Sequence, residues 1–149
     1  MTEQEVAEAR ERYLAEGMEM PLKYLVHDVG AHRDAALMEL RDEDGMEAYG
    51  RYWLLMEVIA ERRGHRVDVK RPNGWARLAR DLELEGPDQA RAFVERLLTL
   101  NLVSRSSYAR GLVSVNRIDR TAEEAARDYA SGKVGALVRW AKRQVKGVE

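Results

Sequence analysis

The sequence predicts a mainly α-helical fold with a small β-hairpin, arranged as a winged helix-turn-helix with extra N- and C-terminal helices. Two short amphipathic segments joined by Glu83–Gly86 predict the helix-turn-helix. Two β-prone runs, Leu102–Arg105 and Leu112–Val115, surround a glycine-containing turn and predict the hairpin that forms the wing. The 149 residues are enough for one core but not for two independent ones.

The two helices of the helix-turn-helix are predicted from helical spacing and from residues suited to helix ends. Asn73 is suited to cap the first helix, and Pro87 suits the first turn of the second because its missing N–H would be unpaired there anyway. The second helix is expected to stop near Asn101. The apolar residues expected to face the core are Trp75, Leu78, Ala79 and Leu82 on the first helix and Ala90, Phe93, Val94, Leu97 and Leu98 on the second.

An N-terminal helix is predicted from a capping box formed by Thr2 and Glu5, and it is expected to end near Gly17. Its apolar face is thin, which fits either a loosely docked arm or a segment that binds a partner. The segment Met20–Val29 is expected to be extended. Asp34 then caps a short helix.

The strongest predicted helix covers Met46–Arg63. Asp44 and Glu47 form a possible capping box at its start, and Gly64 is suited to its end. Its expected core residues are Tyr49, Tyr52, Trp53, Met56, Ile59 and Ala60. A short strand is expected within Arg66–Arg71, where apolar and charged residues alternate.

A C-terminal helix is predicted from a third capping box, formed by Thr121 and Glu124, and is expected to reach about Lys146. Gly132 and Gly135 weaken its middle by roughly 1 kcal/mol each relative to alanine, so a break near Gly132 is one alternative. The chain is therefore expected to have three parts. These are an N-terminal helical arm (1–19), a winged-helix domain (20–118) and a C-terminal basic amphipathic helix (119–149).

Composition is that of a globular protein and excludes several kinds of site. Hydrophobic residues make up 45% of the chain and charged residues 34%, which is too apolar for disorder throughout. The absence of cysteine excludes disulfides, thiolate zinc sites, iron–sulfur clusters and cysteine nucleophiles. The N-terminus is acidic and polar, and no apolar run approaches about 20 residues, so we expect a cytoplasmic protein without a membrane span.

Three sequence blocks upstream of the helix-turn-helix share a recognisable pattern: His27–Asp34, Leu37–Arg41 and Gly45–Trp53. The chain from Tyr24 to Ile118 resembles the N-terminal winged-helix domain of phage replisome-organiser-like proteins. The family pattern is aromatic-x-His-Asp, a downstream Asp, a leucine-rich helix and Gly-x-x-Gly/Ala-Tyr-Gly-x-Tyr-Trp-x-Leu-x-Glu. The resemblance implies a phage or prophage origin and a role in DNA replication, through origin binding or assembly of a helicase-loading complex.

Charge is divided unevenly along the chain, although the net charge is only −1. Residues 1–69 hold 9 Lys/Arg against 16 Asp/Glu, a net charge of −7, whereas residues 70–149 hold 16 against 10, a net charge of +6. The basic half contains the predicted winged helix, which favours DNA as a partner. The candidate nucleic-acid-binding residues are Lys70, Arg71, Arg77, Arg91, Arg96, Arg105, Arg110, Arg139, Lys142, Arg143 and Lys146.

The sequence of the second helix of the pair is poorly suited to contact DNA, because acidic residues lie on its exposed face. Helical geometry puts Asp88 and Glu95 near the centre of its exposed face, with Arg91 and Arg96 on the flanks. Either this helix contacts DNA through its flanks, or the helix-turn-helix mainly binds protein. Arginines on the wing and a basic stripe on the last helix are better suited to phosphate, and a solvated basic face is the competing interpretation.

Other clusters favour structural roles. His27, Asp28, His32 and Asp34 are ligand types for divalent metals, but they lie in one short segment where the aspartates are suited to caps and turns, so no metal site is predicted. The last helix carries a basic stripe beside an apolar one. We expect it first to pack on the rest of the protein; binding to DNA ranks second and lying on a membrane surface a distant third. The three tryptophans, Trp53, Trp75 and Trp140, lie on apolar faces and are expected in the core.

The sequence therefore indicates a binding module and not an enzyme, without cofactor, since no nucleophile–base pair or phosphate-binding glycine loop is present. The first hypothesis is a DNA-binding module of a phage-type replication initiator that contacts the backbone. The alternatives are a winged-helix scaffold that forms a homo-oligomer or holds a replication protein, and a transcriptional regulator.

Overall fold

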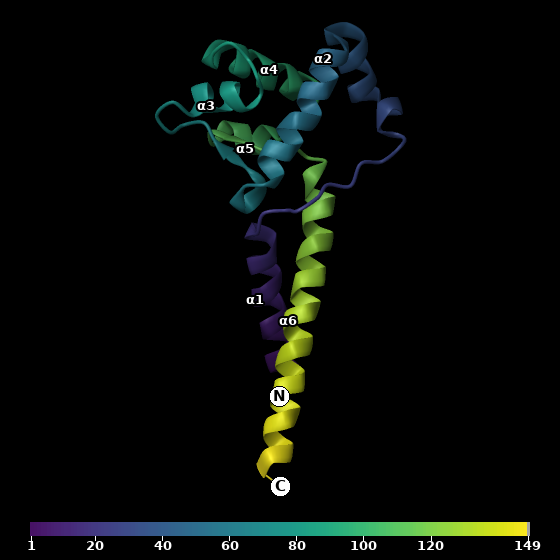
Figure 1. Cartoon of the computed structure of the whole chain (residues 1–149), viewed down its shortest axis with the longest axis vertical. Coiled ribbons are helices and arrows are strands. Elements are labelled where there is room, and N and C mark those ends of the chain that lie inside the picture. The colour runs from purple at the N-terminus through teal and green to yellow at the C-terminus, as the bar shows by residue number, and fades with distance from the viewer. Residues whose placement is uncertain (149) are drawn as a thin grey trace. The chain divides into compact units, whose positions relative to one another are not determined.

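The structure is a computed structural model that describes residues 1–148, so Glu149 at the end of the predicted C-terminal part lies outside it. The described chain is mainly helical with one two-stranded antiparallel sheet, as the sequence predicts (Figure 1). It divides into two compact units, which are described separately. One comprises Met1–Met20 and the chain from Arg120 onward, and the other is Pro21–Asp119.

Helix α2, Ala35–Ala60, carries the largest group of buried side chains in the Pro21–Asp119 unit. Asp34 caps it as predicted, because its carboxylate accepts hydrogen bonds from the backbone N–H groups of Ala36 (3.1 Å) and Leu37 (3.2 Å). Gly45 (φ +92°, ψ 171°) is not helical, so two helices meet at a kink within this span, and the second begins directly after Gly45, in agreement with the predicted start at Met46.

Two details at the ends of the second half of α2 differ from the sequence expectation. The Asp44 carboxylate accepts hydrogen bonds from the side chain of Arg96 instead of serving a capping box. The helix ends at Ala60, three residues before the predicted Arg63. Its fully buried side chains are Leu37, Leu40, Tyr52, Leu55, Met56 and Ile59, whereas Tyr49 and Trp53 are half-buried.

The predicted helix-turn-helix helices are present as α3, Gly74–Asp81, and α4, Pro87–Thr99. Pro87 lies in the first turn of α4, as predicted. Asn73 stands before α3 in a left-handed conformation (φ +60°), but its side chain makes no capping hydrogen bond. The apolar positions Leu78, Ala79 and Leu82 of α3 and its end, and Ala90, Val94 and Leu97 of α4, are buried as expected.

The predicted wing differs from a simple hairpin. Its two runs meet at one antiparallel bridge, between Val103 and Val115, and a short helix, α5 (Arg105–Ala109), occupies the connection. Strand β2, Leu112–Val113, pairs instead with strand β1, Val67–Asp68. In this register Val67 lies opposite Val113, and Asp68 lies opposite Leu112. Ser104 caps α5 through its hydroxyl, which accepts from the N–H of Ser107, so the residues after Val103 favour a helical turn over an extended one.

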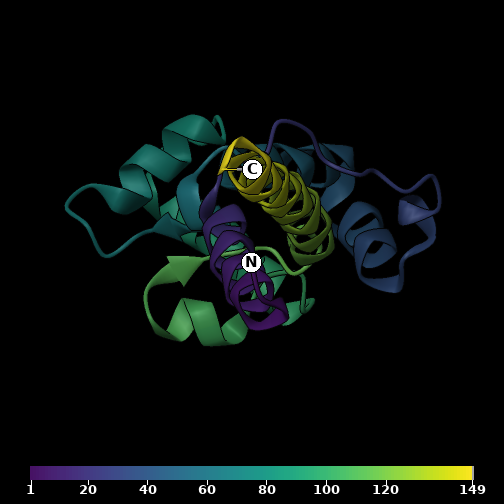
Figure 2. The ribbon, with the colours of Figure 1, turned by 90° about the horizontal axis from the view of Figure 1, so that it is seen from below.

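The other unit pairs helix α1, Glu3–Glu19, with helix α6, which runs over Ile118–Val148 and enters this unit at Arg120 (Figure 2). The capping box of Thr2 and Glu5 is present. Gly17 lies against the backbone of Ala126, and the hydroxyl of Tyr129 donates to Glu16 at 2.7 Å. The predicted N-terminal arm is therefore packed along α6.

The start and middle of α6 correct two sequence expectations. The helix begins at Ile118, and Thr121 is a buried residue within its first turns, so the predicted capping box with Glu124 does not start the helix. No break occurs at Gly132, since α6 is continuous over its described length. The buried Ala122, Ala126, Ala130 and Val134 recur every four residues along it.

Gly74, at the start of α3, and Gly50, in α2, give a matched test of how closely the backbone packs in the Pro21–Asp119 unit. A β-carbon at Gly74 would lie 2.8 Å from the backbone of Val69, so Gly74→Ala should destabilise the protein by more than about 1 kcal/mol. A β-carbon at Gly50 in α2 meets nothing within 4 Å, so Gly50→Ala should stabilise it by roughly 0.5–1 kcal/mol. Urea unfolding measures both, and equal effects of the two substitutions would contradict the close approach at Gly74.

Candidate nucleic-acid interface

The residues of the family-like pattern converge in space around Arg117, a residue that the sequence analysis did not single out. Its guanidinium lies 3.6 Å from the carboxylate of Asp28 and 3.5 Å from that of Asp34. Asp34 also caps α2, so one carboxylate fixes both the start of the helix and the position of Arg117. The arginine thus fastens the segment before α2 to the chain just before α6.

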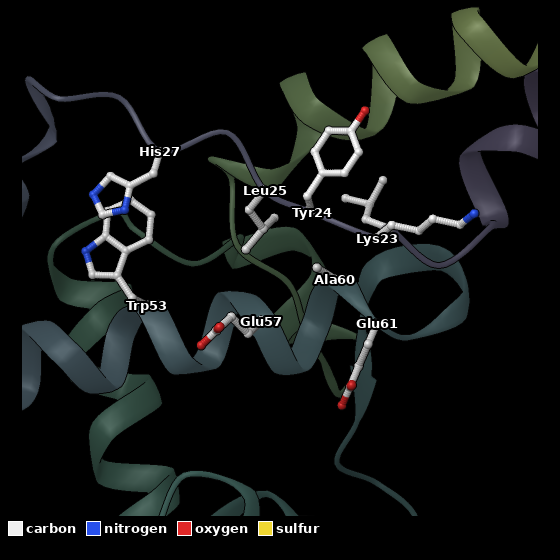
Figure 3. A pocket seen from close by; sticks show the side chains of 9 residues that line it. Lys23, Tyr24, Leu25, His27, Trp53, Glu57, Ala60 and Glu61 are labelled. Carbon is white, nitrogen blue, oxygen red and sulfur yellow. The ribbon is translucent and has the colours of Figure 1, made fainter.

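The His27 ring stacks on the indole of Trp53, with ring centroids 3.7 Å apart and an angle of 17° between the rings (Figure 3). The N–H of Leu22 donates to the carbonyl of Ala60 at 2.8 Å and holds the same segment at the other end of α2. Between these anchors lies an open cavity of about 640 Å³. Its lining comprises Leu22, Lys23, Tyr24, Leu25, His27, Trp53, Glu57, Ala60 and Glu61.

Tyr52 is completely buried beside this cluster, and the guanidinium of Arg117 lies near its hydroxyl without forming a hydrogen bond of good geometry within the described residues. Burial raises the pKa of Tyr52 to about 12, because the phenolate would lose its hydration; the positive charge of Arg117 opposes this effect only in part. The tyrosine is therefore neutral at physiological pH and acts as a core residue.

The four residues considered as metal ligands each have another partner. His27 stacks on Trp53, Asp28 and Asp34 contact Arg117, and Nδ1 of His32 lies 2.9 Å from the carbonyl oxygen of Val29. Residues 1–148 contain no group of three or more histidine, aspartate or glutamate side chains that could hold a metal ion. These residues shape the segment before α2.

The predicted cations of the β1–α3 loop and of the wing lie together. The N–H of Val69 donates to the carbonyl of Gly111 at 3.0 Å, and the aliphatic part of Lys70 occupies the space that a β-carbon at Gly111 would need. This contact brings Lys70 beside the exposed residue Arg110. We call Lys70, Arg71 and Arg110 the basic edge; their side chains are exposed, as is that of Arg77 on α3.

The side chains of the basic edge make only long polar contacts with the rest of the protein. Arg71 lies 3.6 Å from Asp68, whose carboxylate also accepts from the N–H of Lys70 and so shapes the loop. Arg110 donates to the carbonyl of Ser106 at 3.4 Å. Lys70 and Arg77 have no ion pair within the part of the chain that the structure describes, so their charges are available to a ligand.

Two other predicted cations are held by the protein itself. Arg96 donates hydrogen bonds to Asp44 (3.1 and 3.2 Å) and Glu43 (2.7 Å), and the Asp44 contact raises the pKa of Arg96 above its usual value. Arg105 donates to the carbonyl of Leu98 and to the side chain of Asn101, at the C-terminal end of α4. Arg96 therefore links α4 to α2, and Arg105 links α5 to the C-terminal end of α4.

The exposed face of α4 contacts α5, which lies within the predicted wing. The hydroxyl of Tyr108 in α5 donates to Glu95 at 3.0 Å, and its ring meets the edge of Trp75. The guanidinium of Arg91 lies over Trp75, 5.5 Å from the ring centroid, and 3.8 Å from Glu95. The Glu95 carboxylate therefore has partners and is a smaller obstacle to a polyanion than its sequence position indicated.

The C-terminal candidates lie in the other unit, on the exposed surface of α6: Arg139, Lys142, Arg143 and Lys146. None of these four side chains has an ion pair among residues 1–148. Trp140, which was expected in the core, is 60% exposed. It stands three positions after the half-buried Leu137, but two after Val138 and one before Ala141, so it lies at the border of the apolar side and not at its centre, which explains why that prediction is wrong.

Comparisons of the chain with protein-family models, with curated proteins and with solved structures found no match. Across residues 1–148, each helix is too short or too polar to cross a bilayer.

The ionisation of Tyr52 has a measurable consequence. The folded state holds the Tyr52 proton up to about pH 12, whereas an unfolded chain releases it near pH 10. The free energy of unfolding should therefore fall between about pH 10 and 12, by roughly 2–3 kcal/mol. Tyr52→Phe should remove this part of the decline, because phenylalanine has no hydroxyl to ionise. Exposed Tyr24→Phe, the control, should keep the decline in urea titrations.

The two roles of Asp34 can be separated by substitution. Asp34→Ala removes both the cap of α2 and the contact with Arg117, and should destabilise the protein by about 1–2 kcal/mol. Asp34→Asn keeps a side-chain oxygen that can cap the helix, so it should cost clearly less. Guanidinium unfolding measures the difference, and an asparagine variant as unstable as the alanine variant would contradict the capping role.

Proposed function

We propose that residues 21–119 form a winged-helix module that binds DNA through its phosphate backbone, in a phage or prophage replication-initiation protein of the replisome-organiser type. One observation carries the proposal: the hydrogen bond between Val69 and Gly111 joins two loops and places Lys70 beside Arg110 on an exposed edge. Free, clustered cations on a rigid edge are suited to phosphate contact.

The order of elements supports the winged-helix assignment. A helix (α2) is followed by a strand (β1), two helices (α3 and α4), the bridge residue Val103, the wing segment with α5, and a last strand (β2). The run 112–115 lies between β1 and Val103, since Val113 pairs with Val67 and Val115 with Val103. This is the connectivity in which a wing follows the second helix of a helix-turn-helix.

The residues of the family-like pattern support the replication role. His27, Asp28 and Asp34 come from the first block, and Tyr52 and Trp53 from the third. They meet in one place, through the ring stack on Trp53 and the contacts with Arg117. The pattern is thus a set of residues that folds together, which is what a shared domain requires.

Salt dependence tests the proposal. Lys70→Gln combined with Arg110→Gln should weaken duplex binding for every sequence and lower the slope of log affinity against log salt by up to about 1.8, which is roughly 0.9 for each lost phosphate contact. Fluorescence anisotropy with a labelled duplex at several salt concentrations measures both quantities.

A matched control has the same loss of charge elsewhere on the unit. Lys23→Gln with Arg33→Gln removes two exposed cations outside the basic edge and should leave the affinity within about two-fold. Absence of duplex binding at low salt, or equal effects of the two pairs of substitutions, would contradict the proposal.

A partner-binding scaffold is the second candidate, because the segment before α2 leaves apolar side chains in solvent. Tyr24 is 78% exposed and Val29 is 94% exposed, and Val26 is exposed as well. Under this alternative, duplex DNA would not bind at low salt. Charged substitutions at Val26 and Val29 would then lower the self-association measured by sedimentation.

A further inference from the structure

We propose that the second half of α6 binds single-stranded nucleic acid, with phosphates on Arg139, Lys142, Arg143 and Lys146 and with one base stacked on Trp140. This inference rests on the proposed function, which it deepens by naming the form of the nucleic acid. It concerns the unit formed by α1 and α6, whereas the basic edge lies in the other unit.

Trp140 is a large apolar side chain that the packing of α1 on α6 leaves in solvent. The two helices approach each other through small residues, as the contact between Gly17 and Ala126 shows. The apolar residues on the α1 side of α6 include Val134, which is buried, and Val138, which is half-buried. Trp140 does not share that side, so its indole face is free to stack on a flat partner.

The surroundings of Trp140 have one sign of charge. From residue 129 to residue 148 the sequence contains five cations and no carboxylate. Arg143 lies about one helical turn after Trp140, and Arg139 and Lys146 continue the row at spacings that share a face. An exposed indole at the edge of a row of unpaired cations is the combination that single-strand-binding surfaces use.

An open apolar groove of about 520 Å³ lies next to this row, within the same unit. Val138, Ala141 and Val145 of α6 contribute its apolar part, together with Met1 and Val6. Lys142, Arg143 and Lys146 also line it, so cations lie next to an apolar surface. A single strand presents both phosphates and unpaired bases to such a surface.

The exposed indole is what favours a single strand over a duplex. Cations contact the phosphates of either form, but the faces of paired bases are covered by their stacked neighbours. An indole on a helix surface can therefore stack only on a base that is already unpaired. A preference that depends on Trp140 and not on charge would show this chemistry.

Trp140→Ala in the full chain is the direct test. Its affinity for a labelled oligothymidine of about 15 nucleotides should fall about 5- to 100-fold, whereas its affinity for a hairpin duplex should change less than two-fold. Trp140→Phe should recover part of the lost affinity because its ring can still stack. Quenching of tryptophan emission by oligothymidine should be smaller in both variants than in the unchanged protein.

A pair of matched substitutions on the same helix tests the cations. Arg139→Gln with Arg143→Gln should weaken binding of both forms of DNA, because both arginines are unpaired among the described residues. Arg120→Gln with Arg127→Gln removes the same charge, but these arginines lie 3.4 Å from Glu124 and 4.0 Å from Glu123, so binding should change little.

The outcomes separate this inference from the proposed function. If Lys70→Gln with Arg110→Gln weakens duplex binding and Trp140→Ala leaves oligothymidine binding unchanged, the proposed function stands and this inference is overturned. If no DNA binds, both fall. Loss of binding to phosphatidylserine vesicles in Trp140→Ala, or a change of its mass in light scattering, with oligothymidine binding intact, would overturn it in favour of a membrane or a second copy.

Discussion

Burial of the second half of α2 is the constraint on which the Pro21–Asp119 unit depends. Tyr52, Leu55, Met56 and Ile59 are removed from solvent almost completely, and this apolar surface is a major favourable term in the folding of the unit. The segment before α2 packs along the same helix, through the ring of His27 on Trp53. The position of that segment, and of the cavity beside it, is therefore set by the helix.

Local sequence signals predicted the elements well where a short range of residues decides the outcome. The cap at Asp34, the capping box at Thr2 and Glu5, and Pro87 in the first turn of α4 depend only on residues within one turn. The wing was predicted as a plain hairpin because its two runs are β-prone. In the structure Ser104 caps a short helix, α5, between these runs, and β2 pairs with β1, so the segment is not a plain hairpin.

The candidate site was harder to predict, because counting charges does not reveal which charges are free. Arg96 was assigned to the interface from its position on α4, yet Asp44 and Glu43, more than fifty residues earlier in the sequence, neutralise it. Arg117 was overlooked because its two carboxylates are distant in sequence. No periodicity or spacing rule joins such pairs, whereas Lys70 and Arg110 could be proposed from charge alone.

Gly45 shows how a residue without a side chain sets an electrostatic contact. With φ at +92°, it lets the backbone leave the helical path for one residue, a conformation that L side chains rarely adopt. Asp44 stands directly before this interruption, and its carboxylate lies 3.1 Å from the guanidinium of Arg96 on α4. The place of α4 thus depends on its own buried apolar residues and also on a glycine in α2, whose backbone conformation any larger residue would strain.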